Sequence, residues 1–360
     1  MKNAQLLKHT EVTDDILNYK DKVTGDDGAQ FVKLLKLLIQ YGYEGGIHMD
    51  EKIVKQIFLQ NNLGEVKSIK KIEIGFTNKV YLINNEFILK VCEDEENEDN
   101  FEKEVFFYDF FKDKIPVPQI SVYDNSKKVY NKFFMIYPKI QGDNLYSKWH
   151  LMSNSERRDI IRQLCEILRV INKSSYEEFT KRFKLNSSVN WHDRILDQIQ
   201  NSLKKIEDKK IISTEFVQAI KNFIKENHNV LTEQKIALVY WDAHFDNILI
   251  QGNIIVGILD FERTNLSSID FALDTIRRMA EYPKKYMSKE FRKFAKKEDY
   301  AKLLEWFHEF YPELFEFKNL GKRLDLYAIE HDLKDLIGWP NDNEVKQMIA
   351  KTINYNSLTF

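Results

Sequence analysis

Hydrophobic positions along this chain change their spacing, from short runs near the start to long helical stripes later. Short apolar runs predict strands, and they occupy residues 66–74, 79–83, 87–92 and 133–137. The asparagine pair at 84–85, between two of these runs, predicts a tight hairpin. A helical spacing covers 101–111 and returns from Ser153 onward, where Glu156 completes a capping-box signal. The chain is therefore predicted to begin with a strand-rich part and to continue mostly as helix.

The helical part is interrupted at residues 236–260 by the pattern of a hairpin. An apolar run ends at Asp242, and Asn247 opens the next run. Gly252-Asn253 is a turn signal, and a third apolar run leads to Asp260. Folding about this turn pairs residue 247 near residue 258, and Asp260 lies two positions further on, at the same open end. Asp242 can join both residues across a tight loop.

Three polar groups at one end of an apolar hairpin indicate a functional site. Any one of Asp242, Asn247 and Asp260 would be explained by the preference of Asp and Asn for turns and strand ends. Together they offer an amide oxygen and a carboxylate, which suit Mg²⁺, an ion that takes few protein ligands and also binds substrate phosphates. A free carboxylate beside that ion can accept a proton from a hydroxyl group.

The same stretch resembles the catalytic core of the aminoglycoside phosphotransferase and choline kinase superfamily. That superfamily carries His-Gly-Asp-x-x-x-x-Asn, then a strand, then Ile-Asp-Trp/Phe-Glu; here the corresponding residues are Tyr240-Trp241-Asp242, Asn247 and Leu259-Asp260-Phe261-Glu262. The resemblance implies that Asp242 is the catalytic base and that Asn247 and Asp260 bind Mg²⁺. Tyr240 and Trp241 depart from the usual His and Gly, but neither position supplies the base or a metal ligand.

Lys90 lies inside an apolar strand, where a buried lysine is costly unless it is paired or faces a polar cleft. The alternative is an edge strand on which Lys90 faces solvent. The resemblance implies a strand lysine that binds the nucleotide phosphates and pairs with a glutamate of the following helix. Glu104 fits that glutamate best, because helical apolar positions follow it, and Glu102 is the alternative if the helix is rotated.

Further nucleotide-binding residues are implied by the resemblance alone. The tetrad that begins at Gly75 matches a Gly-x-x-Asn loop of the family, so Gly75, Thr77 and Asn78 are expected at the nucleotide, although most such tetrads are plain turns. The strand at 133–137 corresponds to the crossing between two lobes. There the backbone of Ile136 and Tyr137 is expected to meet the adenine or guanine edge.

The helix that follows the hairpin carries three acidic residues of interest. Asp270 begins this helix, and the resemblance implies that it supports the catalytic loop from behind. Asp274 and Glu281 are seven residues apart and share a helix face, which predicts an acidic site for an amine-bearing acceptor; a solvated face is the alternative. Asp332, much further along, is expected on a solvated helix face.

The resemblance implies an α+β, two-lobed protein-kinase-like fold, with a small antiparallel-sheet lobe and a larger helical lobe. The corresponding domains are an N-terminal extension at 1–47, a nucleotide-binding lobe at 48–137, and a helical lobe at 138–360 that holds the catalytic loop and the acceptor site. A stretch of nine residues separates Asp260 from Asp270, which leaves little platform for a peptide substrate and favours a small-molecule acceptor.

Composition narrows the class of protein. Lys and Arg total 54 while Asp and Glu total 56, so the chain lacks the basic excess that is typical of nucleic-acid-binding proteins. Cys92 and Cys165 each lie in an apolar periodic segment, which favours buried thiols in a reducing compartment over a disulfide or a zinc site. No apolar run approaches membrane-spanning length, and the first residues lack a signal-peptide apolar region. The sequence predicts a cytoplasmic protein that binds neither nucleic acid nor membrane.

The function that the resemblance implies is phosphotransfer. With Mg²⁺ and ATP or GTP as donor, the γ-phosphoryl group would move to a hydroxyl of a small molecule, such as an aminoglycoside-like or other amine-bearing acceptor. The alternative is a catalytically silent kinase-like scaffold of the spore-coat type, to which the changes at Tyr240 and Trp241 give weight. The sequence leaves the acceptor, the donor base and the oligomeric state open.

Overall fold

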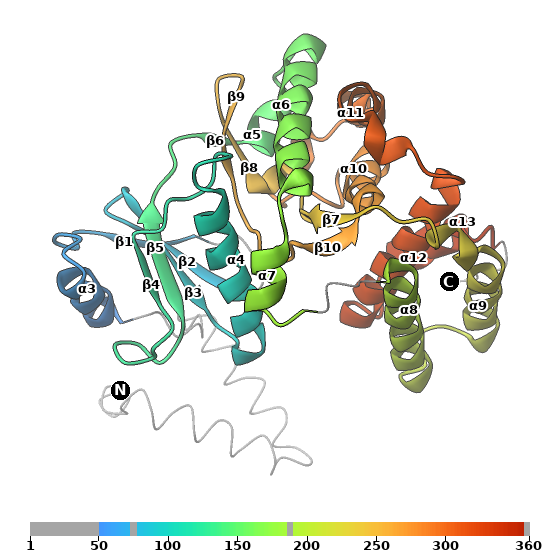
Figure 1. Ribbon diagram of the computed structural model, residues 1–360, viewed down its shortest axis with the longest axis horizontal. Coiled ribbons are helices and arrows are strands. Elements are labelled where there is room, and N and C mark those ends of the chain that lie inside the picture. Colours follow the sequence, from blue (N-terminus) through green and yellow to red (C-terminus); the bar gives the residue numbers. More distant parts are fainter. Residues whose placement is uncertain (1–49, 73–77, 186–189, 356–360) are drawn as a thin grey trace, which may run out of the picture. The chain divides into compact units, whose positions relative to one another are not determined.

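The structure is a computed structural model that describes residues 50–72, 78–185 and 190–355. The chain divides into two compact units, residues 1–54 and 55–360. The second unit contains both a sheet lobe and a helical lobe (Figure 1). The predicted extension at 1–47 and the expected nucleotide contacts Gly75 and Thr77 lie outside the described residues.

The sheet lobe is built on five strands whose neighbours are all antiparallel. Their spatial order is β1 (Ile69–Ile72), β2 (Asn78–Ile83), β3 (Phe87–Cys92), β5 (Phe134–Pro138) and β4 (Val122–Asp124). The β2–β3 connection is the predicted hairpin: Asn84 and Asn85 have φ of 55° and 59°, a left-handed conformation that asparagine tolerates better than most residues.

Helix α4 (Glu98–Phe111) belongs to the sheet lobe and contributes much of its core. Its buried residues recur at the spacing of one helical face, and they are Phe101, Glu104, Phe107, Tyr108 and Phe111. One of the five is a glutamate. A buried carboxylate needs a charged or hydrogen-bonding partner, so Glu104 is expected to have one within the core of this lobe. Helix α3 (Glu51–Gln60) precedes β1 in the chain.

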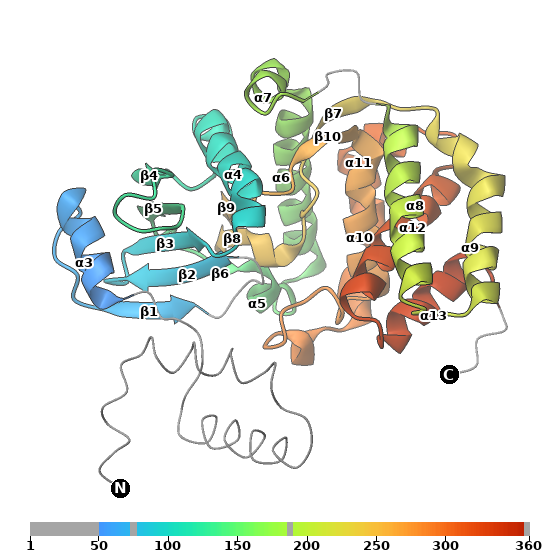
Figure 2. The ribbon, with the colours of Figure 1, turned by 90° about the horizontal axis from the view of Figure 1, so that it is seen from below.

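The helical lobe begins after β5, and Figure 2 shows its later helices grouped around α12. Helix α12 packs against α8 and α13. Helix α6 starts with the predicted capping box, in which Ser153 and Glu156 satisfy each other's backbone N–H groups. The bounds are α5 (Leu145–Trp149), α6 (Asn154–Lys173), α7 (Glu177–Arg182), α8 (Trp191–Asp208), α9 (Thr214–Asn227), α10 (Ala272–Glu281), α11 (Leu303–Phe310), α12 (Leu320–Gly338) and α13 (Asn343–Thr352).

Two small antiparallel sheets frame the loop that holds Asp242. Strand β7 (Ile236–Val239) pairs with β10 (Asn265–Ser268), and β8 (Ile248–Gln251) lies between β6 (Asp143–Asn144) and β9 (Ile254–Ile258). The predicted hairpin is present, but its register is shifted by one residue: a bulge after Leu249 makes the carbonyl of Asn247 accept from the N–H of Leu259 at 2.9 Å. This register sets Asn247 directly opposite the residue before Asp260.

A buried ion pair supports the β7–β10 sheet from behind. Asp270, just after β10, accepts from Arg323 Nε at 2.7 Å and from Arg323 Nη2 at 3.0 Å, and both residues are fully buried. Ser268 Oγ and Tyr327 OH also donate to the Asp270 carboxylate, at 2.5 and 2.9 Å. The expected supporting role of Asp270 thus has a physical form, since α12 is tied through Arg323 to the sheet below the loop.

Asp332 differs from its expected position on a solvated face. It is only 1% exposed, because α12 lies between other helices and is surrounded on several sides. No helix within the described part of the chain is both long and apolar enough to span a membrane.

We predict that Arg323→Met lowers the free energy of unfolding by about 3–5 kcal/mol, because the Asp270 carboxylate is left buried without its counter-charge. The measurement is urea denaturation followed by circular dichroism. Arg158→Met is the matched control: Arg158 pairs with Glu309 on the surface, with side chains 48% and 44% exposed, and should cost less than about 1 kcal/mol. Equal losses in the two variants would contradict the anchoring role of Arg323.

Candidate active site

Lys90 and Glu104 form a buried ion pair between the sheet and α4. Lys90 Nζ lies 2.6 Å from Glu104 Oε2, with Lys90 8% exposed and Glu104 fully buried. Burial alone would lower the pKa of Lys90, but the charges of Glu104 and Asp260 outweigh it and hold that pKa above its usual range. Lys90 is therefore a fixed cation, and the edge-strand alternative, with the lysine in solvent, does not apply.

The structure pairs Lys90 with Glu104 and turns Glu102 elsewhere. The Glu102 carboxylate accepts hydrogen bonds from Tyr123 OH at 3.1 Å and from Asn125 Nδ2 at 2.9 Å. The helix phase that the sequence favoured is therefore the one present. Glu104 also has a second partner, which the sequence did not predict: Tyr108 OH donates a hydrogen bond to its Oε1 at 2.6 Å.

Asp260 follows β9 and faces the Lys90–Glu104 pair from the other lobe. Its Oδ1 lies 3.8 Å from Lys90 Nζ and is buried with no hydrogen-bond partner among the described residues. The backbone of Asp260 has φ of 62°, in the left-handed region that few non-glycine residues occupy. Left-handed backbone at a residue with an unpaired carboxylate oxygen is typical of functional positions.

Three carboxylates gather at this point, and they fit a divalent cation. Ligand oxygens of Glu104, Asp260 and Glu262 all lie within 4.8 Å of one another. Burial and the charge of Asp260 raise the pKa of Glu262 to about 7, which reflects the crowding of negative groups. A hard cation with oxygen ligands would relieve that crowding and would give Asp260 Oδ1 the partner it lacks.

Asn247 is held in the loop by its amide nitrogen. Nδ2 donates to the backbone carbonyl of Asp242 at 3.1 Å, which leaves the amide oxygen as the atom that could bind a metal. Glu262 was quoted in the sequence motif without a role, and the signal that could have identified it is its spacing, two residues after Asp260. In the structure Glu262 also accepts from Asn78 Nδ2 at 3.1 Å, so the expected nucleotide residue Asn78 reaches the carboxylate cluster.

Asp242 lies in the loop after β7 with its carboxylate largely buried. Burial raises the pKa of Asp242, while the Arg263 guanidinium, 3.7 Å from Oδ1, and His244 act in the opposite direction. A carboxylate whose pKa is raised toward neutrality is a stronger base than an exposed one, yet it stays ionised when a cation stands beside it. Arg263 is a second residue that sequence reasoning missed.

The two residues that depart from the family pattern are directed into the protein interior. Tyr240 OH donates to the carbonyl of Leu259 at 2.5 Å, and its ring packs on Phe261. Trp241 Nε1 donates to Ser267 Oγ of β10 at 2.7 Å, and its ring packs on Trp191 and Phe271. Both side chains therefore stabilise the loop that carries Asp242, by hydrogen bonds and by ring packing.

The expected purine edge on β5 is only partly available. The carbonyl of Ile136 accepts from the backbone N–H of Ser121 at 2.8 Å, so the neighbouring strand β4 already uses it. The Tyr137 ring is buried against Tyr108, with ring centroids 6.2 Å apart. The residue that follows, Pro138, has no N–H to offer.

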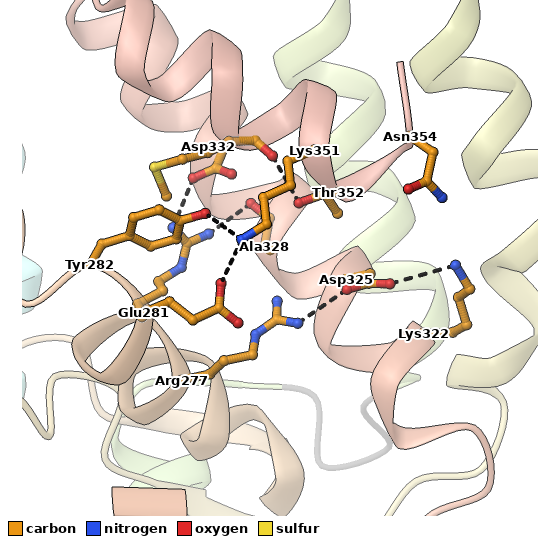
Figure 3. A pocket seen from close by; sticks show the side chains of 12 residues that line it. Arg277, Glu281, Tyr282, Lys322, Asp325, Ala328, Asp332, Lys351, Thr352 and Asn354 are labelled. Carbon is orange, nitrogen blue, oxygen red and sulfur yellow. Dashed lines mark hydrogen bonds and ion pairs between the residues drawn. The ribbon is translucent and has the colours of Figure 1, made fainter. Parts of the chain in front are cut away.

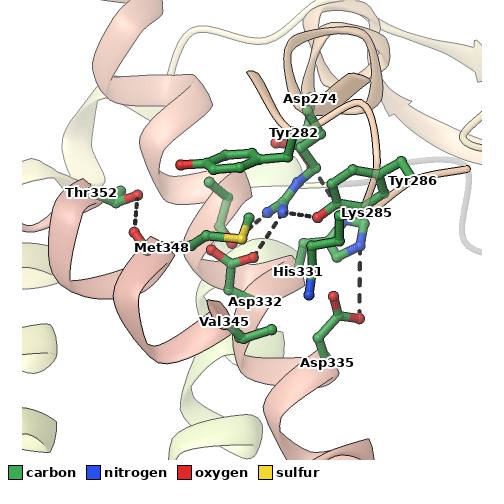
Figure 4. A network of polar contacts seen from close by, with 12 residues as sticks. Asp274, Tyr282, Lys285, Tyr286, His331, Asp332, Asp335, Val345, Met348 and Thr352 are labelled. Atoms are coloured by element: carbon green, nitrogen blue, oxygen red, sulfur yellow. Dashed lines mark hydrogen bonds and ion pairs between the residues drawn. The ribbon is translucent and has the colours of Figure 1, made fainter. Parts of the chain in front are cut away.

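Asp274 and Glu281 do not form the single acidic site that their spacing predicted. Asp274 is 2% exposed, and its Oδ2 accepts from Arg278 Nε at 2.9 Å; Arg278 also donates to Asp332 at 2.8 Å (Figure 4). Burial opposes ionisation of Asp274, but Arg278 and His331 hold the pKa of its carboxyl well below the usual range. The ion pair with Arg278 therefore stabilises the Asp274 carboxylate in the interior of the lobe.

Glu281 instead lines a separate cavity of about 230 Å³ between α10, α12 and α13 (Figure 3). Its carboxylate is 3.8 Å from Lys351 Nζ and 43% exposed. Asp332, from the other side of the Arg278 network, lines the same cavity, whereas Asp274 does not. A shared helix face therefore did not bring the two acidic residues into one pocket: Asp274 pairs with Arg278, whereas Glu281 lies near Lys351.

Residues 68–273 match the profile of the phosphotransferase enzyme family. The gentamicin complex of APH(2″)-IIa aligns with a TM-score of 0.63 at 17% identity, over 87% of this chain and 98% of that chain. ADP-bound aminoglycoside phosphotransferase APH(2″)-Ib gives 0.62 at 17% identity, over 86% and 98% of the two chains. A thermostable mutant of APH(4)-Ia, in ternary complex with ADP and hygromycin B, gives 0.58 at 13% identity, over 85% and 99%. These likenesses confirm the predicted kinase-like fold.

We predict that Glu104→Gln lowers the free energy of unfolding by about 1.5–3 kcal/mol, because it removes a charged hydrogen bond from a buried lysine. Chemical denaturation measures the loss. Glu102→Gln is the matched control, since it makes the same change one half-turn away on α4, and it should cost less than about 1 kcal/mol. A larger loss in Glu102→Gln would show that the helix phase is misassigned.

Proposed function

This chain belongs to the phosphotransferase enzyme family, and from that membership we propose that it transfers the γ-phosphoryl group of ATP or GTP to a hydroxyl group of a small molecule. The observation that carries the proposal is a fixed cation beside a carboxylate oxygen that accepts no hydrogen bond from the described residues. Lys90 is held by Glu104 at 2.6 Å and lies 3.8 Å from Asp260 Oδ1, which has no hydrogen-bond partner in the described part of the chain.

Lys90 would bind the donor phosphates as a point charge. Its ion pair with Glu104 fixes the ammonium group before the nucleotide arrives, so that less order is lost when the phosphates bind. Asp260 and Asn247 would hold Mg²⁺, with Glu262 as a further oxygen ligand. When bound, the ion would neutralise charge on the donor's phosphates.

Asp242 would accept the proton of the acceptor hydroxyl. The loop that carries it is held at its two ends, by the Asn247 amide on the Asp242 carbonyl and by Trp241 on β10. A base that is fixed in this way orients the attacking oxygen as well as deprotonating it. Arg263, 3.7 Å away, would keep the carboxylate ionised.

An amine-bearing acceptor is the class that we favour. On α10 and α12 two buried carboxylates, Asp274 and Asp332, share one guanidinium, that of Arg278. Asp274 Oδ1 and Asp332 Oδ2 are both buried without hydrogen-bond partners among the described residues. Arg277 Nη2 also lies 4.0 Å from Asp274 Oδ1, so two arginines face these two carboxylates and the cluster has no negative charge left over for a bound cation. The preference for an amine-bearing acceptor therefore rests on the solved structures of similar fold, which include complexes of those proteins with gentamicin and with hygromycin B.

The silent-scaffold alternative rested on Tyr240 and Trp241. Each makes a hydrogen bond that supports the loop, to Leu259 and to Ser267. These replacements are therefore compatible with a working loop, and no observation favours the scaffold.

We predict that Asp260→Ala abolishes the Mg²⁺-dependent thermal stabilisation by ATP or GTP while the protein remains folded. The reason is that Asp260 is the carboxylate with an unpaired buried oxygen in the cluster. Differential scanning fluorimetry with and without Mg²⁺ measures the effect. Asp143→Ala, which removes an exposed carboxylate paired with Lys148, serves as control and should respond like the wild type. Full stabilisation in Asp260→Ala would place the metal elsewhere.

Asp242→Asn should lower kcat by about 10²–10⁴-fold, the usual contribution of a general base, with Mg²⁺–nucleotide binding unchanged. An acceptor panel of amine-bearing and neutral alcohols, assayed by nucleoside diphosphate release, identifies the substrate on which to measure it. Wild-type turnover retained in Asp242→Asn would remove this residue from the chemistry.

The pH profile offers a separate check on Asp242. The base must be deprotonated, so activity falls as pH drops through its pKa. Burial raises that pKa, and the Arg263 cation lowers it. Arg263→Gln should therefore move the acid limb of kcat/KM to higher pH, whereas Arg158→Gln, a change on the surface of α6, should leave the limb in place. A limb that stays in place, or moves to lower pH, in Arg263→Gln would contradict this assignment.

A further inference from the structure

The peptide group between Leu259 and Asp260 is held at both of its polar atoms by buried tyrosines. Its carbonyl oxygen accepts from Tyr240 OH at 2.5 Å, and its N–H donates to Tyr108 OH at 2.9 Å. Each tyrosine is 1% exposed. Tyr108 comes from α4 of the sheet lobe and Tyr240 directly follows β7 of the helical lobe, so residues of both lobes hydrogen-bond to one peptide group.

We infer that Tyr108 and Tyr240 are positioning residues that set the direction of the Asp260 carboxylate, and we call the pair the tyrosine clamp. The inference rests on the proposed function in one respect, namely that Asp260 binds the metal. It adds Tyr108, which lies outside the quoted motif, and gives a role to Tyr240, which occupies the position of the family's usual His.

Asp260 needs such a clamp because its backbone is in an unfavourable conformation. A left-handed φ of 62° is unfavourable in a residue with a Cβ, although aspartate tolerates it better than most. Rotation of the preceding peptide would relieve that cost and redirect the side chain. In the clamp, that rotation would leave a carbonyl and an N–H buried without partners, which costs more than the strain it relieves.

The donors and acceptors of the clamp have only one consistent arrangement. A tyrosine hydroxyl has one proton. Tyr240 donates its proton to the Leu259 carbonyl, whereas Tyr108 donates its proton to Glu104 Oε1 at 2.6 Å and accepts from the N–H of Asp260. Because Glu104 Oε2 holds Lys90, one continuous path of hydrogen bonds joins the phosphate-binding lysine to the backbone of the metal-binding aspartate.

The next side chain, that of Phe261, packs against the rings of the same two tyrosines. The Phe261 ring lies 4.8 Å from the Tyr240 ring and 5.8 Å from the Tyr108 ring, centroid to centroid. The clamp therefore fixes the chain on both sides of the Asp260 Cα, by hydrogen bonds before it and by ring packing after it.

Tyr240→Phe tests the clamp most cleanly, because it keeps the ring on Phe261 and removes only the hydroxyl. We expect the affinity of the protein–ADP complex for Mn²⁺, measured by electron paramagnetic resonance, to fall about tenfold, the effect of one buried hydrogen bond. Metal-free ADP affinity, measured by calorimetry, should not change. Tyr311→Phe is the matched control: it removes a buried hydroxyl bond of 2.8 Å to Asn172 and should leave Mn²⁺ affinity as in the wild type.

Tyr108→Phe should behave differently, because its hydroxyl also supports Glu104. Mn²⁺ affinity and metal-free ADP affinity should both fall. Unchanged Mn²⁺ affinity in both Tyr240→Phe and Tyr108→Phe would overturn the clamp, and so would an equal loss in Tyr311→Phe.

Amide hydrogen exchange in the nucleotide-free protein separates the clamp from the proposed function. The Asp260 N–H should exchange faster in Tyr240→Phe and Tyr108→Phe than in the wild type, and at the wild-type rate in Tyr311→Phe. If the wild type bound neither ADP nor Mn²⁺, the proposed function would fail while the exchange rates still decided the clamp. Unchanged exchange at Asp260 in both clamp variants would overturn it.

Discussion

The buried ion pair between Lys90 and Glu104 is the interaction on which the rest of the site depends. Burying two charges costs more than their attraction returns in many proteins, so such a pair is weak evidence for stability alone. Its effect here is geometric. Glu104 must lie on the inner face of α4, and this places Tyr108, one turn later, where its hydroxyl meets both Glu104 and the backbone of Asp260. One pair thereby connects the sheet, the helix and the turn that carries Asp260.

The buried carboxylates differ in how completely they are satisfied, and the difference separates support from chemistry. Both carboxylate oxygens of Asp270 accept hydrogen bonds, from Arg323, Ser268 and Tyr327, so neither is available to a ligand. Asp260 Oδ1 has no such bond among the described residues, although that oxygen is itself buried; the Asp260 side chain as a whole is 34% exposed and faces Lys90 Nζ at 3.8 Å. An unsatisfied buried acceptor is costly to keep, so its persistence indicates a partner that arrives later. Asp274 is an intermediate case, because Arg278 holds Oδ2 at 2.9 Å while Arg277 Nη2 lies 4.0 Å from Oδ1.

Local pattern predicted the elements well, and long-range contacts lay beyond it. Strands β1, β2, β3 and β5, the Asn84-Asn85 hairpin, the capping box of α6 and the phase of α4 all follow from residues close together in sequence. The hairpin register was off by one because a bulge has no clear signal in apolar spacing. Contacts such as Tyr108 to Asp260, 152 residues apart, depend on how two lobes meet. Asp332 was misplaced for the same reason, since burial of α12 is decided by α8 and α13.

The two departures from the family pattern show how a loop can keep its geometry with different side chains. A glycine in place of Trp241 would leave the loop with no ring to pack, whereas the indole here joins Trp191 and Phe271 and ties the loop to α8 and to the turn before α10. Tyr240 donates a hydrogen bond to the Leu259 carbonyl, so the residue that follows β7 directly supports the turn after β9. The loop of Asp242 and the turn of Asp260 are thus supported by two adjacent residues, Trp241 and Tyr240. A substitution at either residue should therefore change the position of both Asp242 and Asp260.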